Sequence, residues 1–310
     1  MNGQNSKEII YSYQHIKTTS KYTDVIRFYN NADGGWASFV PTQNLVDMFE
    51  MSNGKTIDEA GSGYDPVYPF YNRDPRLKNT VIYSGQDWVG RNNVSRIFNT
   101  IDKTLPNGSL NNDYYVAANN ASHTGMLWAK YLYPNQAQYS TSMNDDALCP
   151  IMFRYAEILL TKAECLVELN QNLSDALDII DQLRLRGGHI AVDRSKYNTQ
   201  AKIRELVRRE RTIELAGEGF RYEDIVRWDV YDASGAKTGQ KVAEIVMPGD
   251  LLRLAGTVNY GEPNPDRRAV INLNAAREDR LVEVRYFDKK QFHLPIPQAE
   301  MDANPQLVQN

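Results

Sequence analysis

The stretch RRERTIELAGEGFRYEDIVRW, residues 208–228, carries five basic and five acidic side chains in twenty-one positions. At about 100° per residue, helical periodicity places four apolar side chains on one face: Ile203, Leu206, Val207 and Ile213. Glu210 and Glu214 fall in the middle of that face, whereas Glu205, Arg208 and Arg209 point away from it. The sequence therefore predicts an amphipathic helix with two carboxylates on its buried side.

Carboxylates in an apolar stripe cost free energy unless cations and backbone donors satisfy them. Arg211, Arg221 and Arg227 are the nearest cations in sequence. We interpret five side chains as one structural ion-pair network: Glu210, Arg211, Glu214, Glu218 and Arg221. The spacing alone leaves an acid–base pair as an alternative, because buried pairs also perturb pKa values.

Composition narrows the classes of partner. The chain has 310 residues, a formal charge of −4 and a pI of about 5.7. Since it has no basic block, a nucleic-acid partner is disfavoured. Its four histidines are far apart and its cysteines are only two, Cys149 and Cys165, so no metal site and no cofactor are expected. A Cys149–Cys165 bridge stays open.

Amino-acid composition and hydrophobic patterning divide the chain into three parts. Residues 1–150 are loop-rich, with a few short strands and one helix expected at PTQNLVDMFEM (41–51). Residues 151–231 predict three or four helices, and residues 232–310 return to loops. No run approaches the roughly 18 apolar residues of a membrane span.

Two segments of the helical part form a predicted hairpin. In FRYAEILLTKAECLVELN (153–170), the expected apolar face is Tyr155, Ile158, Leu159, Ala163, Leu166 and Leu169. Glu157, Thr161, Glu164 and Glu168 are expected to form the opposite face. The second helix is expected to begin at an N-cap, Ser174, and to end before Gly187–Gly188. The pair resembles a single tetratricopeptide-type hairpin, with no second copy at a regular period.

Five stretches in this order resemble the SusD/RagB family, the glycan-capturing lipoproteins of the Bacteroidota outer membrane. They are PTQNLVDMFEM (41–51), YNRDPRL (71–77), FRYAEILLTKAE (153–164), the charged stretch 208–228 and LPIPQAEMDANPQLVQN (294–310). The resemblance implies a mainly α fold, in which a tetratricopeptide-like hairpin and further helices pack against a loop-rich region with few short strands. It also implies that the acids and arginines of 208–228 and the Arg73–Arg76 stretch are structural, with Pro75 fixing a turn and with Arg73 and Arg76 pairing with acids.

The resemblance to this family also implies a function. It implies a non-enzymatic protein that binds oligosaccharides or polysaccharides at the outer-membrane surface and delivers them to a TonB-dependent transporter. Family members begin with a lipoprotein signal, an acylated cysteine and a helical N-terminal half, and MNGQNSKEIIYSYQH (1–15) shows none of these. The chain is therefore expected to be a single C-terminal region of such a protein, without the lipid anchor.

Sugar recognition needs aromatic rings that stack on pyranose C–H faces and planar polar groups that bind hydroxyls. The loop-rich residues 1–150 form the expected glycan-binding face. Its candidate ligand-binding residues are Trp36, Tyr64, Tyr68, Trp88, Tyr114 and Tyr115, and the alternative for each is that it pins a loop to the core. Trp36, Tyr64 and Tyr68 are favoured because Gly, Asn and Asp flank them, whereas Trp128 and Trp228 are expected in the core.

Two other functions are weighed against glycan binding. A glycoside hydrolase needs one carboxylic acid with a raised pKa and a second carboxylate about 5–9 Å away, and nothing in the sequence selects such a pair. A helical scaffold that binds a protein and no sugar would be favoured if Trp36, Tyr64 and Trp88 all proved buried.

Overall fold

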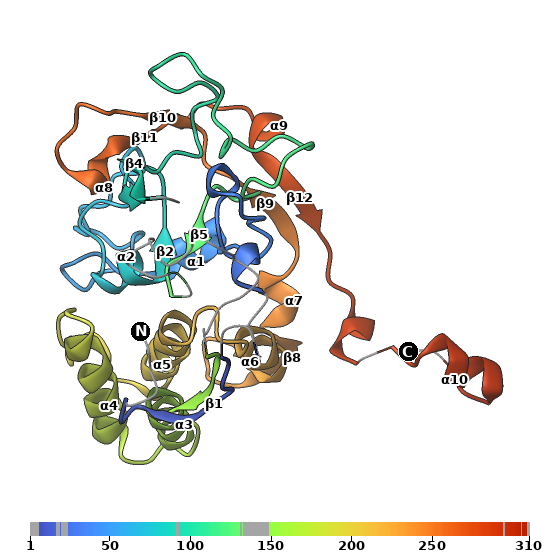
Figure 1. Cartoon of the computed structure of the whole chain (residues 1–310). Coiled ribbons are helices and arrows are strands. Elements are labelled where there is room, and N and C mark those ends of the chain that lie inside the picture. Colours follow the sequence, from blue (N-terminus) through green and yellow to red (C-terminus); the bar gives the residue numbers. More distant parts are fainter. Residues whose placement is uncertain are drawn as a thin grey trace.

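The structure is a computed structural model of the whole chain. It describes residues 6–16, 19, 24–90, 93–130, 132, 149–293, 295–304 and 306–308. In Figure 1 a group of helices occupies one end of the molecule, and a region of loops and short strands covers the other. The C-terminal segment runs from the body to a helix, α10 (Gln298–Ala303), that stands apart from it.

The helical end is built from three long helices. α3 (Tyr155–Glu168) and α4 (Leu173–Arg186) form a hairpin, and α5 (Gln200–Glu214) packs against both. Their apolar side chains form a continuous core that includes Ala156, Leu160, Ile180, Leu183, Leu206 and Val207. α6 (Arg221–Arg227) follows, which confirms the prediction of three or four helices between residues 151 and 231.

The loop-rich end has its own apolar core, and α5 reaches into it. Ile213 of α5 packs with residues around α1 (Gln43–Met48) and α2 (Arg76–Thr80), among them Val46, Phe49 and Leu77. A second core lies beside it and contains Val25, Tyr29, Trp88, Phe98 and Leu127. Because α5 contributes to both ends, it is the element that joins them.

The strands of the described residues pair in small antiparallel sheets of two strands each. These pairs are β1 (Ile9–Ser12) with β6 (Ile151–Arg154), β2 (Val81–Ile82) with β5 (Leu127–Trp128), β3 (Asp87–Val89) with β4 (Ser95–Ile97), β7 (Asp229–Tyr231) with β8 (Lys237–Lys241), β9 (Gly249–Leu252) with β12 (Leu281–Arg285), and β10 (Gly256–Val258) with β11 (Ala269–Ile271). The remaining short helices are α7 (Ala243–Val246), α8 (Pro265–Arg268) and α9 (Arg277–Arg280), with 3-10 turns at Asp24–Arg27, Asn31–Asp33 and Lys289–Phe292. The predicted fold class, mainly α with few short strands, is confirmed.

Three local predictions are wrong. The segment 232–310 contains paired strands as well as loops. α4 begins at Leu173, and its N-cap is Asn172, with a positive φ of 46°, which lies two residues before the predicted N-cap Ser174. On α3 the buried face includes Ala156, Leu160 and Glu164, while Tyr155 and Ile158 are half-exposed. Glu164 is buried because Arg227 and the indole Nε1 of Trp228 donate hydrogen bonds to it.

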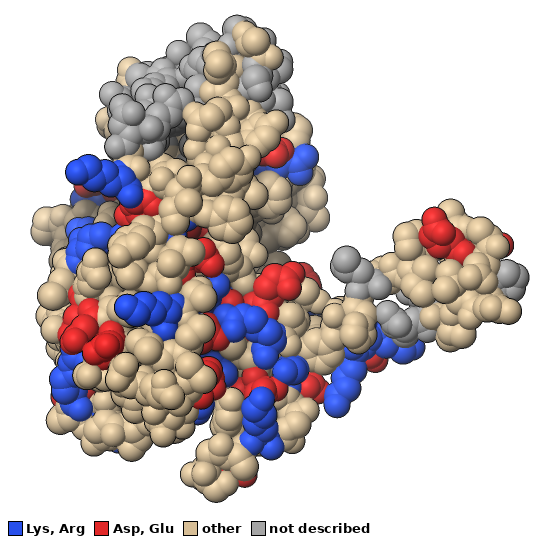
Figure 2. Space-filling model, turned by 90° about the horizontal axis from the view of Figure 1, so that it is seen from below, with Lys and Arg blue, Asp and Glu red and all other residues tan. Residues whose placement is uncertain are grey.

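The two cysteines are not joined by a disulfide, and Cys165 is exposed. Trp228 is buried as predicted, and Trp128 is half-buried. Within the described residues, no helix combines the length and the apolar character needed to cross a bilayer. Figure 2 looks onto the helical end, where basic and acidic side chains are interspersed rather than gathered into a block of one sign.

Candidate functional site

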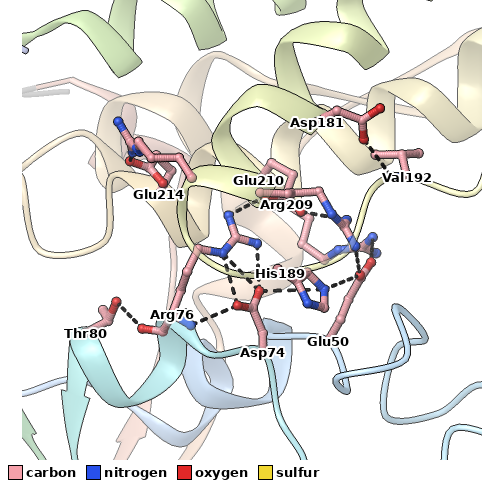
Figure 3. Close-up of polar contacts among 12 residues, drawn as sticks. Glu50, Asp74, Arg76, Thr80, Asp181, His189, Val192, Arg209, Glu210 and Glu214 are labelled. Atoms are coloured by element: carbon pink, nitrogen blue, oxygen red, sulfur yellow. Dashed lines mark hydrogen bonds and ion pairs between the residues drawn. The ribbon is translucent and has the colours of Figure 1, made fainter.

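An ion-pair network joins the loop-rich end to the helices (Figure 3). Glu210 of α5 is 0% exposed, and its carboxylate accepts hydrogen bonds from Arg76 of α2 at 2.8 Å and from Arg184 of α4 at 2.9 Å. Arg76 also pairs with Asp74 at 2.6 Å. Glu50, directly after α1, pairs with Arg184 as well. The network therefore ties three helices and two loops together in the interior.

The charges of this network balance. Three carboxylates (Glu50, Asp74 and Glu210) face three guanidinium groups (Arg76, Arg184 and Arg209). Burial would raise the pKa of Glu50, but the hydrogen bond from His189 and the charges of Arg209 and Arg184 lower the pKa of Glu50 to about 2. The carboxylate is thus held ionised, as expected for a structural pair rather than for a proton donor.

Glu214 and Glu218 form a second arm at the end of α5. Arg154 of β6 donates to Glu214 at 2.7 Å and to Glu218 at 2.6 Å. Arg186 of α4 also reaches Glu214, and Lys130 reaches Glu218 at 2.8 Å. Burial acts to raise the pKa of Glu214, yet Arg154 and Arg186 lower it overall. This arm fastens β6 and α4 to α5.

The cations predicted for these carboxylates are the wrong ones. Arg211 pairs with Asp224 of α6 at 2.8 Å, and Arg221 donates to the Thr212 hydroxyl at 2.9 Å. Successive residues of a helix point about 100° apart, so Arg211 faces α6 while its neighbour Glu210 faces α2 and α4.

Two other arginines also differ from prediction. Arg209, expected to point outward, reaches Glu50 and the Tyr197 hydroxyl. Arg73 donates to the backbone carbonyls of Val46 and Phe49 instead of pairing with an acid. An extended guanidinium can span from the edge of a helix to a distant acceptor, which helical angle alone does not predict.

Trp36 is the most accessible of the predicted ligand-binding rings, at 45% exposure. It stands beside exposed Phe39, and the Arg27 guanidinium carbon lies 5.9 Å from the Trp36 ring centroid and 5.7 Å from that of Phe39. Arg27 is ion-paired with Asp24 at 3.0 Å. The ring pair therefore belongs to a surface whose local charge is neutralised.

Tyr64 and Tyr68 lie in different surroundings, although both are half-buried. Tyr64 is 5.4 Å from the guanidinium of buried Arg73, and burial raises the pKa of its hydroxyl. Tyr68 and Tyr71 share a different arginine, since the Arg267 guanidinium lies 4.6 Å and 5.0 Å from their ring centroids. Tyr68 therefore belongs to a two-tyrosine surface that the sequence did not reveal.

Tyr114 and Tyr115 share one guanidinium. The guanidinium carbon of Arg253 lies 5.6 Å from the Tyr114 ring centroid and 5.5 Å from that of Tyr115. The exposed His123 ring lies 4.5 Å from the Tyr115 ring. Arg253 is more than 130 residues from these tyrosines, so no local signal in the sequence could have identified it.

Trp88 requires a correction. It is 6% exposed, packs with Tyr29 and Phe98, and its indole Nε1 donates to Asp33 at 2.7 Å. Its side chain faces the core because β3 pairs with β4 directly over the apolar cluster of Val25 and Leu127. Trp88 therefore holds the loops together and offers no ring face to a ligand.

A hollow of about 230 Å³, lined by both polar and apolar side chains, lies beside this core. It is lined by Ala32, Arg96, Ile97, Asn99, Leu105, Ser109, Leu110, Asn111, Asn112 and Asp113. Arg96 pairs with Asp33 at 2.7 Å and lies 3.8 Å from Asp113. Burial raises the pKa of Asp113 to about 6, despite hydrogen bonds from the Ala32 backbone and the Asn30 side chain.

A model of the SusD family matches residues 1–310. The chain belongs to the SusD family. It is 30% identical over 145 residues to SusD-like protein P38 of Formosa agariphila, a match that covers 44% of this chain and 27% of that protein. It is 38% identical over 165 residues to SusD-like protein P2 of the same organism, covering 52% of this chain and 25% of that protein.

A solved SusD-like structure agrees with the fold. The crystal structure of a SusD-like carbohydrate binding protein from Bacteroides fragilis matches with a TM-score of 0.73 and 28% identity. The match covers 99% of this chain and 55% of that one. The chain thus spans about half the length of that SusD-like protein, and its matches cover about a quarter of the curated relatives.

Proposed function

We propose that this SusD-family chain binds oligosaccharides or polysaccharides without cleaving them, at the outer-membrane surface, and passes them to a TonB-dependent transporter. Family membership and the similar carbohydrate binding protein from Bacteroides fragilis support glycan binding. The transporter and the membrane surface follow from the family resemblance. The proposal for this chain itself depends on its exposed aromatic rings.

The observation that carries the proposal is the rigid mounting of the exposed Trp36 ring. Its backbone N–H donates to the Ile26 carbonyl at 2.8 Å, and the next residue, Ala37, donates to Tyr29 at 2.8 Å. Gly35 packs so tightly that a Cβ there would lie 2.3 Å from the Tyr29 carbonyl oxygen. A large apolar ring on a fixed backbone, open to solvent, binds a ligand at a lower ordering cost than the same ring on a flexible loop.

The expected affinity is weak. A ring that stacks on an open surface contributes about 1–2 kcal/mol, by analogy with aromatic pairs. Two or three such rings support a dissociation constant in roughly the micromolar to millimolar range after the cost of association. Weak capture suits a protein that must release its ligand to a transporter.

Asp33 and Asp113, the two acids beside the hollow, do not support the glycoside hydrolase alternative. Asp113 has the raised pKa of a general acid, and Asp33 shares Arg96 with it. Both carboxyl groups are buried, however, and protein donors occupy both oxygens of each: Ala32 and Asn30 for Asp113, Arg96 and Trp88 for Asp33. A general acid must reach the glycosidic oxygen, so we assign this pair a structural role.

A protein-binding scaffold is the second candidate, and one observation favours it. Half-exposed apolar side chains gather on β1, β6 and α3: Ile10, Tyr11, Ile151, Met152, Phe153, Tyr155 and Ile158. A scaffold that binds no sugar would be favoured if Trp36, Tyr64 and Trp88 were all buried. Trp88 is in the core, but Trp36 is exposed and Tyr64 is only partly buried. The two functions are compatible, because the apolar strip and Trp36 lie on different elements.

Binding can be tested by affinity electrophoresis of the chain through gels that contain neutral or acidic polysaccharides, followed by calorimetry. We expect Trp36→Ala and Tyr68→Ala each to weaken binding about tenfold with an unchanged melting temperature. Tyr286→Ala, at an 80% exposed tyrosine beyond β12, is the matched control and should bind normally. A folded chain that no polysaccharide retards would refute the proposal, and release of reducing ends would refute its non-enzymatic part.

A further inference from the structure

Ten arginines of the described residues have their guanidinium group within 6 Å of an aromatic ring centroid, and most of them are neutralised by a carboxylate. Arg27, Arg204, Arg208, Arg209, Arg211 and Arg227 each form an ion pair. Four do not: Arg73, Arg221, Arg253 and Arg267. Arg73 is buried and bonded to carbonyls, and Arg221 is bonded to Thr212 beside Asp224. Arg253 and Arg267 remain as half-exposed cations without an ion pair.

Arg253 is positioned by neutral acceptors. Its Nε and Nη2 donate to the Asp279 carbonyl at 3.2 Å and 3.0 Å, and its Nη1 lies 3.4 Å from the Tyr115 carbonyl. A guanidinium has five N–H donors, so two are left without an acceptor in the described chain. α9, which supplies the Asp279 carbonyl, also carries the carboxylates of Glu278 and Asp279, but neither carboxylate pairs with Arg253.

Arg267 repeats the arrangement on α8. Its guanidinium lies 4.6 Å and 5.0 Å from the ring centroids of Tyr68 and Tyr71, and no described carboxylate is within ion-pair distance of it. Desolvation acts to lower its pKa, but hydrogen bonds with both tyrosine side chains help to raise its pKa. Glu262 acts on it electrostatically, but the Glu262 carboxylate accepts from the Asn264 backbone instead. α8 and α9 lie at the two ends of the β10–β11 hairpin (Figure 1). Two sites of the same composition therefore flank one hairpin.

The chain does not lack acids for these positions. It has 39 acidic and 35 basic residues, and a net charge of −4 disfavours general attraction of polyanions. A half-exposed arginine that lies beside tyrosines and has no carboxylate paired to it is suited to a planar or tetrahedral anion, which it binds through two hydrogen bonds. The adjacent tyrosine rings supply an apolar surface for the sugar that carries the anion.

Resting on the proposed glycan binding, we propose that the ligand is an anionic oligosaccharide, whose carboxylate or sulfate groups are recognised by Arg253 and Arg267. Tyr114 and Tyr115 at one site, and Tyr68 and Tyr71 at the other, contact the sugar rings. The Trp36 surface, where Arg27 is already paired with Asp24, binds an uncharged part of the oligosaccharide.

The test uses polysaccharide pairs that differ only in charge: dextran sulfate with dextran, and polygalacturonate with its methyl ester. We expect the chain to bind at least one charged member about tenfold more tightly than its neutral partner, and salt to reduce that difference. Preference for dextran sulfate identifies sulfate esters as the recognised group, and preference for polygalacturonate identifies carboxylates.

Variants then assign the recognition to these two arginines. Arg253→Gln and Arg267→Gln should each lower the affinity for the charged polymer about tenfold and leave affinity for the neutral one and the melting temperature unchanged. Arg253→Lys should restore part of the affinity, because the charge remains while the planar fork is lost.

Arg277→Gln is the matched control, since Arg277 is an exposed arginine of α9 already paired with Asp250. If it weakened binding as much as Arg253→Gln, the attraction would be non-specific and the proposal overturned. Equal binding of charged and neutral polymers would overturn the anionic ligand while leaving glycan binding intact. Binding of neither, by a folded chain, would overturn glycan binding itself.

Discussion

Replacing Glu210 by glutamine tests the ion-pair network most directly. The substitution keeps the size of the side chain and one carbonyl acceptor but removes the negative charge that faces Arg76 and Arg184. Two carboxylates then remain against three guanidinium groups, of which Arg76 and Arg184 are buried and Arg209 is partly buried. The variant therefore buries an uncompensated positive charge.

Breaking a buried pair by removing one partner typically costs about 3–5 kcal/mol. Since domains unfold with a free energy of roughly 5–15 kcal/mol, Glu210→Gln should remove a large part of the stability. Glu205→Gln supplies the control, because Glu205 lies on the exposed face of the same helix. Its cost should be below about 0.5 kcal/mol.

Urea unfolding followed by circular dichroism measures both variants. For an m-value of about 3 kcal/mol per molar, Glu210→Gln should lower the midpoint by about 1 M. Arg184→Met should be destabilising alone but should cost less in the Glu210→Gln background, with a coupling of about 0.5–3 kcal/mol. Equal, small effects at positions 205 and 210, or strict additivity with Arg184→Met, would refute the interpretation of these contacts as a coupled buried network.

Three further outcomes are expected. Two buried carboxylates should change the free energy of unfolding in opposite directions as the pH changes. The lowered pKa of Glu50 (about 2, from 4.5) contributes about 3 kcal/mol to the stability above pH 4.5, and this contribution is lost as the pH falls toward 2. The raised pKa of Asp113 (about 6, from 3.8) destabilises the folded chain above pH 6, and this cost vanishes below pH 3.8. Asp113→Asn removes the charge but also one hydrogen-bond acceptor, so the variant should compare more favourably with the unsubstituted chain at pH 7.5 than at pH 3.5; a pH-independent difference in melting temperature would contradict this. Gly256→Ala should cost about 1–3 kcal/mol, because its Cβ would lie 2.1 Å from the Val270 carbonyl oxygen, whereas Gly261→Ala, 3.5 Å from its nearest contact, should be near neutral; similar melting temperatures for the two would count against the close β10–β11 approach. The apolar strip on β6 and α3 should make the chain self-associate, and replacing half-exposed Phe153 and Ile158 by serine should reduce light scattering with little change in melting temperature; unchanged scattering would contradict this role of the strip.

Periodicity in the sequence predicted the helices and the unusual burial of charge on α5. Glu210 and Glu214 fall within an apolar stripe at 3.6-residue spacing, and that spacing is a local property of the chain. The end of α4 at Gly187–Gly188 was equally readable, because Gly188 adopts the positive φ of 80° that follows a helix terminus. The same reasoning failed on α3, where Glu164 lies inside because Trp228 and Arg227 supply its hydrogen bonds from 63 or more residues away.

Tertiary structure alone decided which charges meet and which rings face solvent. Arg76 reaches Glu210 across 134 residues of sequence, while the adjacent Arg211 turns to α6. Trp36 and Trp88 both stand near Gly, Asn and Asp in the sequence, yet Trp36 is 45% exposed, whereas Trp88 packs in the core with Tyr29 and Phe98. Local spacing determines whether a residue can be buried, but the partner that makes burial favourable is supplied by the packing of distant segments. The same packing places Arg253 and Arg267 beside their tyrosines.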